Sequence, residues 1–137
     1  MRNMDKALGD GGMPLLGQLG VNFLRYGEGW VEAEWNPTES ACNPVGGVHG
    51  GVYAVIHDAA MNFATNSALE RGESGATISI TYSTMRGAKA GDALTVRGEV
   101  VRATKQIAYL QTTVTNPAGE IVSSATGQFI LRRRPAE

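Results

Sequence analysis

Alternation of apolar and polar residues is the most frequent pattern in this chain, and it predicts strands that have one face in water. In the clearest example, Val31, Ala33 and Trp35 alternate with Glu32 and Glu34. Turn residues separate the alternating segments, as in the Gly-Glu-Gly and Asn-Pro-Ala-Gly sequences at 27–29 and 116–119. The pattern predicts six strands, in stretches that begin at Val21 and Val31 and in residues 77–84, 94–101, 107–115 and 121–131.

A helical spacing of apolar residues extends from about His49 to Arg71. Gly72 follows it as a C-terminal stop signal. A short helix is predicted over residues 13–19, with Pro14 in its first turn, after a loosely held lead-in over residues 1–12. The packing stripe of the long helix is formed by Val52, Ile56, Ala59 or Ala60, Phe63 and Ser67.

The order of these elements predicts the architecture. Two strands, one long helix and then four strands in consecutive hairpins leave a single helix to be covered by antiparallel strands. This order is typical of an α+β fold in which the sheet curls around the helix. Because no repeat or low-complexity linker divides the 137 residues, we expect one domain over residues 1–137.

Composition narrows the possible classes of function. The apolar fraction of 42% and charged fraction of 18% are those of an ordinary globular protein, and the net charge of -1 argues against a nucleic-acid partner. No apolar stretch approaches the ~20 residues of a membrane span, and no signal-peptide core follows the N-terminus. The single cysteine, Cys42, excludes an intrachain disulfide. We therefore expect a cytoplasmic protein without a membrane partner.

The long helix carries unusually little charge. Between Gly50 and Leu69 its only ionisable side chains, Tyr53 aside, are His57 and Asp58. A helix that is nearly uncharged all round is normally buried on more than one face. At about 100° per residue, Asp58 lies opposite the packing stripe. This second face contains Ala54, Asp58, Met61, Asn62 and Thr65. Either it contacts something other than the chain's own sheet, or it is exposed and Asp58 is solvated.

Four glycines, at positions 46, 47, 50 and 51, lie at or just before the N-terminus of this helix. Glycine lets the backbone approach a ligand closely, and free amides at a helix start favour negative charge. No Gly-Lys-Ser/Thr of a P-loop follows, and the chain has no Gly-x-Ser-x-Gly of a serine hydrolase. His49, His57 and Asp58 do not form a dense ligand set, so neither a metal nor a cofactor is expected.

Asn43, His49-Gly50-Gly51 and Asp58 together resemble the site motif of the hotdog-fold acyl-CoA thioesterases, of the phenylacetate-degradation and 4-hydroxybenzoyl-CoA types. The resemblance extends over roughly residues 30–131. One departure is Gly87, where the family commonly has proline. The resemblance implies the hotdog fold and the hydrolysis of aryl or fatty acyl-CoA thioesters to a free acid and coenzyme A.

The resemblance also implies roles for individual residues. Asp58 would activate water or attack the thioester carbon, and the Gly50 amide would stabilise the developing oxyanion. Asn43 would orient the carbonyl or the water, Thr77 would hydrogen-bond near Asp58 or the water, and His49 would fix the loop. The other residues expected to contact the substrate are Gly51, Met61 and Asn62.

The spacing of Gly50 and Asp58 along the helix predicts that the protein is an oligomer. Gly50 and Asp58 are eight residues apart, so their Cα atoms stand about 12 Å apart on one helix. One thioester carbon cannot easily meet both groups of the same chain, but Asp58 could face the Gly50 amide of a second copy. We expect a homodimer with two shared sites, assembled further into a homotetramer.

Two other functions remain open. A hotdog dehydratase or hydratase would act on an acyl thioester, although the His-Phe-Pro-Gly signature of acyl-carrier-protein dehydratases is absent. A non-catalytic acyl-CoA-binding protein would have no need of Asp58. The acyl group stays undetermined, and the basic residues that could meet the coenzyme A phosphates are Arg86, Lys89, Arg102, Lys105 and Arg132.

Overall fold

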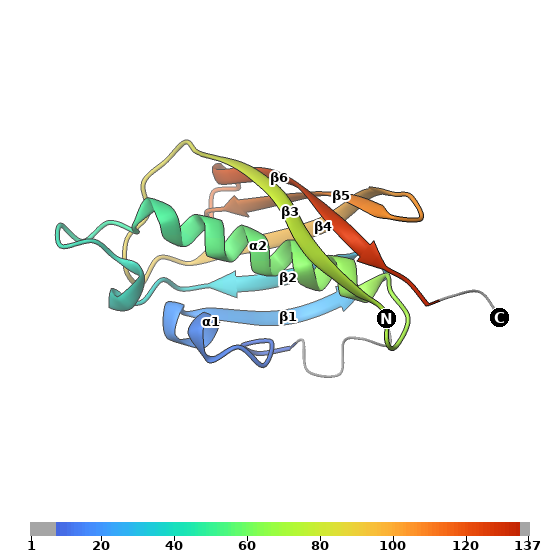
Figure 1. Cartoon of the computed structure of the whole chain (residues 1–137). Helices are drawn as coiled ribbons and strands as arrows, with labels where there is room; N and C mark the ends of the chain where they lie inside the picture. The colour runs from blue at the N-terminus through green and yellow to red at the C-terminus, as the bar shows by residue number, and fades with distance from the viewer. Residues whose placement is uncertain (1–7, 135–137) are drawn as a thin grey trace.

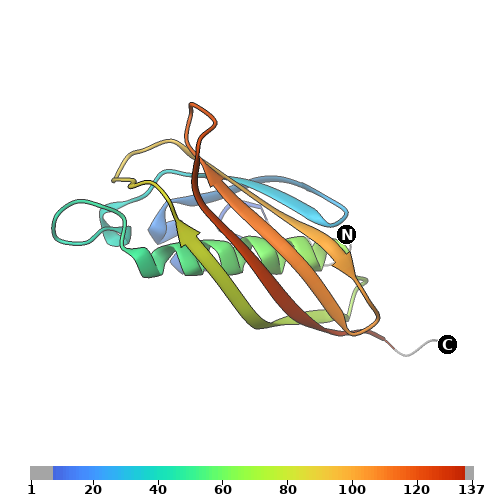
Figure 2. The same cartoon turned by 90° about the horizontal axis from the view of Figure 1, so that it is seen from above.

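The structure, a computed structural model, describes residues 8–134. Its elements are, in order, α1 (Pro14–Leu19), β1 (Val21–Gly27), β2 (Trp30–Trp35), the short 3₁₀ helix η1 (Glu39–Ala41), α2 (Gly50–Ser67), β3 (Ser74–Thr84), β4 (Leu94–Ala103), β5 (Ile107–Thr115) and β6 (Ile121–Arg132). The strands form one antiparallel sheet, and α2 lies along one of its faces (Figure 1). Seen from above, the sheet bends around the helix (Figure 2). The predicted α+β fold, with a curled sheet around one long helix, is confirmed.

The strand order corrects the prediction of consecutive hairpins. The order is β1-β2-β4-β5-β6-β3, so β3 pairs with β6 at the edge of the sheet and the chain then crosses over to β4. Alternation of residue types reports which face of a strand is buried, but it does not report which strand lies beside it. The crossover leaves β3 as an edge strand that lies beside α2 (Figure 1).

The core lies between α2 and the sheet. Val31, Ala33 and Trp35 point inward from β2, as their alternation predicts. Two glycines let the helix come close: a Cβ on Gly98 would stand 2.8 Å from the carbonyl oxygen of Ala60, and one on Gly127 would stand 2.6 Å from the sulfur of Met61. The helix faces the sheet with a buried stripe that contains Tyr53, Ile56, His57, Ala60, Ala64 and Ser67.

The buried part of α2 is wider than the predicted stripe and is rotated from it. Val52 and Phe63, expected to be part of the packing stripe, are half-buried. Met61 is completely buried, and Thr65 is buried and donates a hydrogen bond from its hydroxyl to the Met61 carbonyl (2.9 Å). The interpretation of Met61 and Thr65 as part of an outer contact face is therefore wrong, because the curled sheet covers more of the helix than a flat one would.

The end of α2 also differs from the prediction. The helix stops at Ser67 instead of continuing to Arg71. The Ser67 hydroxyl donates to the Ala64 carbonyl (2.7 Å) and accepts from the Gly29 amide in the β1–β2 turn (2.8 Å), so a tertiary contact fixes the last turn. Within residues 8–134, no helix is both long and apolar enough to cross a membrane.

Candidate active site

The loop before α2 is folded by Asn43. Its side-chain oxygen accepts hydrogen bonds from the amides of Val45 (3.1 Å) and Gly47 (3.2 Å), and its backbone carbonyl accepts from Gly46 (3.0 Å). Gly46 has a φ of 92°, a conformation in which glycine is strongly favoured. Asn43 thus shapes the loop that delivers the chain to the start of the helix.

His49 caps the first turn of α2. Its backbone is extended, and its Nδ1 atom accepts a hydrogen bond from the Gly51 amide (2.9 Å). The Val52 amide donates to the His49 carbonyl (2.9 Å). The Gly50 amide has no acceptor anywhere in residues 8–134, and Gly50 is exposed, with nothing within 4 Å of a Cβ built on it. The capping therefore leaves one free donor at the positive end of the helix.

Asp58 lies in the middle of α2 on a half-buried strip between the core and solvent. The Thr77 hydroxyl, on β3, donates to its Oδ1 atom (2.5 Å). One turn further along α2, the side-chain oxygen of Asn62 accepts a hydrogen bond from the side-chain Nδ2 of Asn66 (2.9 Å). One oxygen of the Asp58 carboxylate is thus held by β3, while Oδ2 has no partner in the described part of the chain.

The structure divides the expected site residues into two groups. Asp58 and Thr77 are in direct contact, with Asn62 one turn away on the same half-buried strip. Asn43, His49, Gly50 and Gly51 form the second group, at the start of α2. The groups stand about 12 Å apart along α2. Met61 joins neither group, because it is buried against β6 and has no access to solvent.

Two residues near these groups were not assigned a role from sequence. Tyr82, on β3, donates from its hydroxyl to the Gly50 carbonyl (3.0 Å). His57 is completely buried, its Nε2 atom is 2.8 Å from the Ser123 hydroxyl, and its ring packs near that of Tyr82 with centroids 5.9 Å apart. Burial lowers the pKa of His57 to about 4, so its ring is neutral near pH 7. The low charge of α2 signals this burial, but no sequence pattern places Tyr82 beside Gly50.

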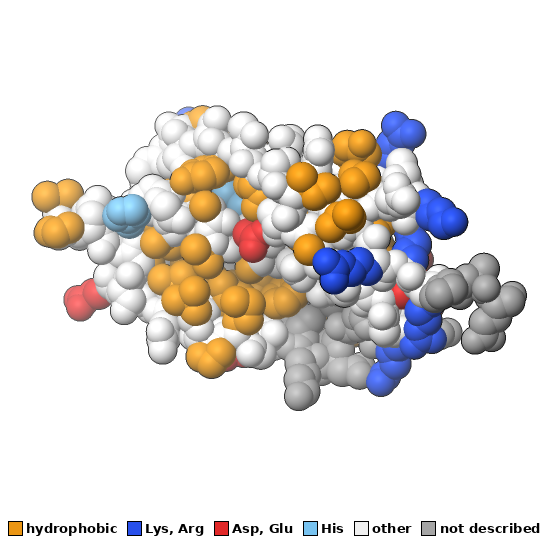
Figure 3. Space-filling view, in the orientation of Figure 1, with side chains coloured by type: hydrophobic (Ala, Val, Ile, Leu, Met, Phe, Trp, Pro, Cys, Tyr) orange, Lys and Arg blue, Asp and Glu red, His pale blue; other side chains and the backbone are white. Residues whose placement is uncertain are grey.

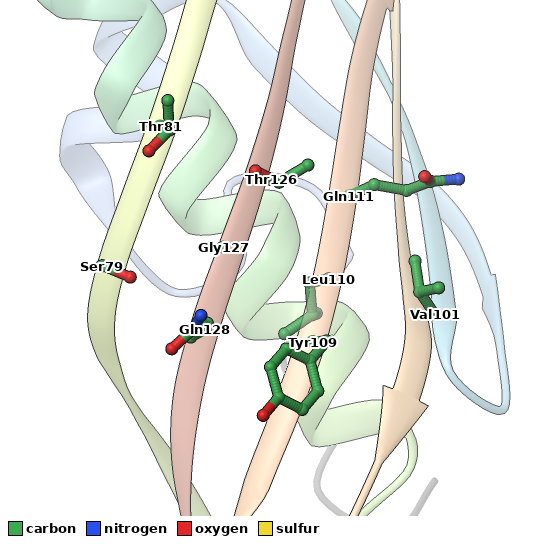
Figure 4. Close-up of a pocket in the computed structure, with 9 residues that line it drawn as sticks. All are labelled: Ser79, Thr81, Val101, Tyr109, Leu110, Gln111, Thr126, Gly127 and Gln128. Atoms are coloured by element: carbon green, nitrogen blue, oxygen red, sulfur yellow. The ribbon is translucent and has the colours of Figure 1, made fainter.

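Hydrophobic side chains gather on the molecular face that carries α2 and α1, while Lys and Arg gather toward the C-terminal end (Figure 3). The opposite face of the sheet has a shallow depression of about 370 Å³, lined mainly by polar residues of β3, β5 and β6 and also by Val101 of β4 (Figure 4). It lies away from Asp58 and the start of α2, so it is not part of the candidate site. Among residues 8–134, no group of three or more His, Cys, Asp or Glu side chains could hold a metal.

An antiparallel sheet curled around one long central helix defines a hotdog-fold protein. Similar folds occur in the Escherichia coli PaaI protein of the phenylacetic acid degradation operon (TM-score 0.79, 23% identity, 91% of this chain and 87% of that one). A Streptococcus pneumoniae hypothetical thioesterase, solved with coenzyme A, is also similar (TM-score 0.77, 22% identity, 85% and 89%).

The sequence profile of the thioesterase superfamily matches residues 45–123, and the chain belongs to this superfamily. Human acyl-coenzyme A thioesterase 13 is 27% identical over 135 residues, which cover 97% of this chain and 82% of the human protein. The matched segment contains the start of α2, Asp58 and Thr77. The chain is accordingly a thioester hydrolase.

Proposed function

We propose that this protein hydrolyses acyl-CoA thioesters to a free acid and coenzyme A at a site formed by Asp58, Thr77 and the Gly50 amide. The observation that carries the proposal is that one helix holds both a carboxylate fixed by a hydroxyl, in its middle, and a backbone amide without an acceptor in the described residues, at its start. The similarity to human acyl-coenzyme A thioesterase 13 supports acyl-CoA as the substrate class. The fold shared with a thioesterase solved with coenzyme A adds to this support.

The chemistry follows from these two groups. Asp58 removes a proton from water, and the resulting hydroxide attacks the thioester carbon. The carbonyl oxygen becomes an oxyanion and is stabilised by the Gly50 amide. Collapse of the tetrahedral intermediate breaks the C–S bond, and the departing thiolate takes the proton from Asp58. The alternative route, in which Asp58 attacks the carbon and water then hydrolyses the anhydride, uses the same two groups.

A second copy of the chain completes each site in this proposal. The distance of about 12 Å between Gly50 and Asp58 is too long for one thioester group to contact both. The edge of β3 offers a surface for the second copy, because within residues 8–134 this eleven-residue strand pairs only with β6 and most of its side chains are exposed. The edge at β1 is less open, since Gly9 forms a bridge with Phe23 there. A homodimer that joins at β3 brings two α2 helices together, and a homotetramer is a dimer of this unit.

Cellular location and phosphate binding are further parts of the proposal. The single, half-buried Cys42 supports the cytoplasm as the place of action. Among the basic residues considered for the coenzyme A phosphates, Arg86 is held in an ion pair with Glu120 (2.7 Å). The other four, Lys89, Arg102, Lys105 and Arg132, are exposed and are the stronger candidates.

The test of the proposal is Asp58→Asn. We expect kcat for acyl-CoA hydrolysis to fall about 100-fold or more, because the amide can neither accept the proton from water nor attack the carbon. Folding is preserved, since asparagine still accepts the Thr77 hydrogen bond. The measurement is thiol release from a panel of aryl, medium-chain and long-chain acyl-CoA substrates. Turnover within threefold of the wild type would contradict the assignment of Asp58.

The same assay distinguishes acyl-CoA hydrolysis from the two alternative functions. A hydratase adds water across an enoyl-CoA double bond and releases no thiol, so loss of enoyl absorbance without thiol would favour that reaction. A non-catalytic acyl-CoA-binding protein would retain intact acyl-CoA, and Asp58→Asn would leave its affinity unchanged.

A further inference from the structure

Tyr82 makes a contact that the proposed chemistry does not use directly. Its hydroxyl donates to the carbonyl of Gly50 (3.0 Å), and its ring packs against His57. The Gly50 carbonyl and the Gly51 amide belong to the same peptide unit, and the Gly51 amide donates to Nδ1 of His49 (2.9 Å). The Tyr82 side chain therefore holds the carbonyl end of this peptide, and the His49 side chain holds its amide end.

The held peptide directly follows the one that carries the free Gly50 amide. Both peptides lie in a glycine-rich entrance, and glycine allows the backbone more conformations than other residues would. An oxyanion donor is effective only when its direction is fixed before the reaction, and a misplacement of about 1 Å can cost two orders of magnitude in rate. The contacts from Tyr82 and His49 restrict the orientation of the first turn of α2.

The strand that carries Tyr82 is anchored to α2 at two points. Thr77 contacts Asp58, and Tyr82 contacts Gly50, so β3 and α2 run in opposite directions side by side. Five residues of strand and eight residues of helix separate these points, and both spans are roughly 12–17 Å. His57 anchors the same region from inside, because Ser123 contacts His57 Nε2 (2.8 Å) and donates to the Ser83 carbonyl of β3 (3.0 Å).

We propose that Tyr82 is a positioning residue, which acts through the Gly50–Gly51 peptide to aim the Gly50 amide at the thioester oxygen. This inference rests on the proposed role of the Gly50 amide. It assigns Tyr82 no contact with the substrate. Loss of the hydroxyl therefore affects the stabilisation of the transition state and leaves substrate affinity unchanged.

The test is Tyr82→Phe, which removes the hydroxyl and keeps the ring against His57. We expect kcat to fall about tenfold with KM within twofold of the wild type, a smaller loss than removal of a whole oxyanion donor. The matched control is Tyr109→Phe, because Tyr109 is similarly exposed (38% against 36%) but lies on the outer face of β5. The control should keep wild-type kcat and KM.

Hydrogen exchange provides a readout that a general loss of stability would not reproduce. In Tyr82→Phe the Gly51 amide should exchange faster, while the amide of the buried Leu110 in β5 keeps its wild-type rate. Wild-type kcat in Tyr82→Phe, an unchanged Gly51 exchange rate, or an equal loss of kcat in Tyr109→Phe would each overturn the inference. These outcomes differ from failure of the proposed function, in which the wild-type protein itself releases no thiol from acyl-CoA.

Discussion

His57 and Asp58 are adjacent in the sequence, yet the fold gives them opposite environments. Asp58 is on the half-buried strip of α2, whereas His57 is completely buried and contacts the hydroxyl of Ser123 on β6. Ser123 donates its own proton to the Ser83 carbonyl, so His57 must donate from Nε2. The Nδ1 atom is buried without a partner. A second proton on this ring would be buried without a hydrogen-bond acceptor.

Acid should therefore destabilise the protein through His57. Its pKa is about 4 in the folded chain and 6.5 as the reference value, so below pH 6.5 the unfolded chain binds a proton that the folded chain does not. The free energy of unfolding should fall by about 1.4 kcal/mol per pH unit as pH decreases from 6.5 toward 4, on account of this group. The measurement is urea unfolding between pH 7 and pH 5, above the range where most carboxylates titrate.

His57→Gln is the control for this prediction. The glutamine amide can still donate to Ser123 but does not titrate, so its unfolding free energy should depend less on pH over the same range. An identical pH dependence in the two proteins would show that another group takes up the proton.

At the scale of elements, the start of α2 has the properties that an oxyanion donor requires. The side chain and carbonyl of His49 satisfy the amides of Gly51 and Val52, which leaves the Gly50 amide free. His49 has φ -63° and ψ 132°, an extended conformation that a following proline accepts. Gly50 is the first residue of the helix, where proline is also well tolerated. The N–H group can thus be removed with little change to the helix.

Gly50→Pro should lower kcat about 100-fold, because it deletes the proposed oxyanion donor. Gly50→Ala is the matched variant: it adds a Cβ in open space but keeps the N–H group, so it should retain most of the activity. Thermal unfolding is measured for both variants alongside thiol release. If Gly50→Pro folds normally and keeps the activity of Gly50→Ala, the oxyanion is stabilised by another group.

At the scale of the whole molecule, the sheet has one long open edge, at β3, beside the helix that carries both groups of the site. The polar contacts of Thr77 and Tyr82 fasten this edge strand to α2 within one chain. Association of two copies at β3 would place two such strand–helix units next to each other. Each proposed site then takes Asp58 from one copy and the Gly50 amide from the other.

Mixing two inactive variants tests this arrangement. In a dimer of Asp58→Asn with Gly50→Pro, one site contains both defects and the other contains none. Random reassortment of equal amounts makes about half of the dimers mixed, so about a quarter of all sites should be wild type. Co-refolding should raise thiol release well above that of either variant refolded alone. No gain, with mixed dimers verified by mass spectrometry, would mean that both groups serve a site within one chain.

The sequence alone determined the features that depend on local periodicity. Alternation in segments such as Val31–Trp35 predicts the six strands, and the uncharged helical segment around Asp58 predicts a helix buried on several sides. The expected contact of Thr77 with Asp58 came from a family resemblance, and the two side chains do meet. The strands and the helix can be predicted from the sequence because each imposes its period on neighbouring residues of the chain.

Only the tertiary structure decided how these elements lie against one another. Pairing of β3 with β6, whose partner residues are 39 or more positions apart in sequence, places Tyr82 at the Gly50 carbonyl and leaves the edge of β3 open. Curling of the sheet buries Met61 against Gly127, although its spacing on the helix placed it on the outer face. Local periodicity identifies a buried face but not the strand that covers it, since strand pairing depends on the packing of the whole core.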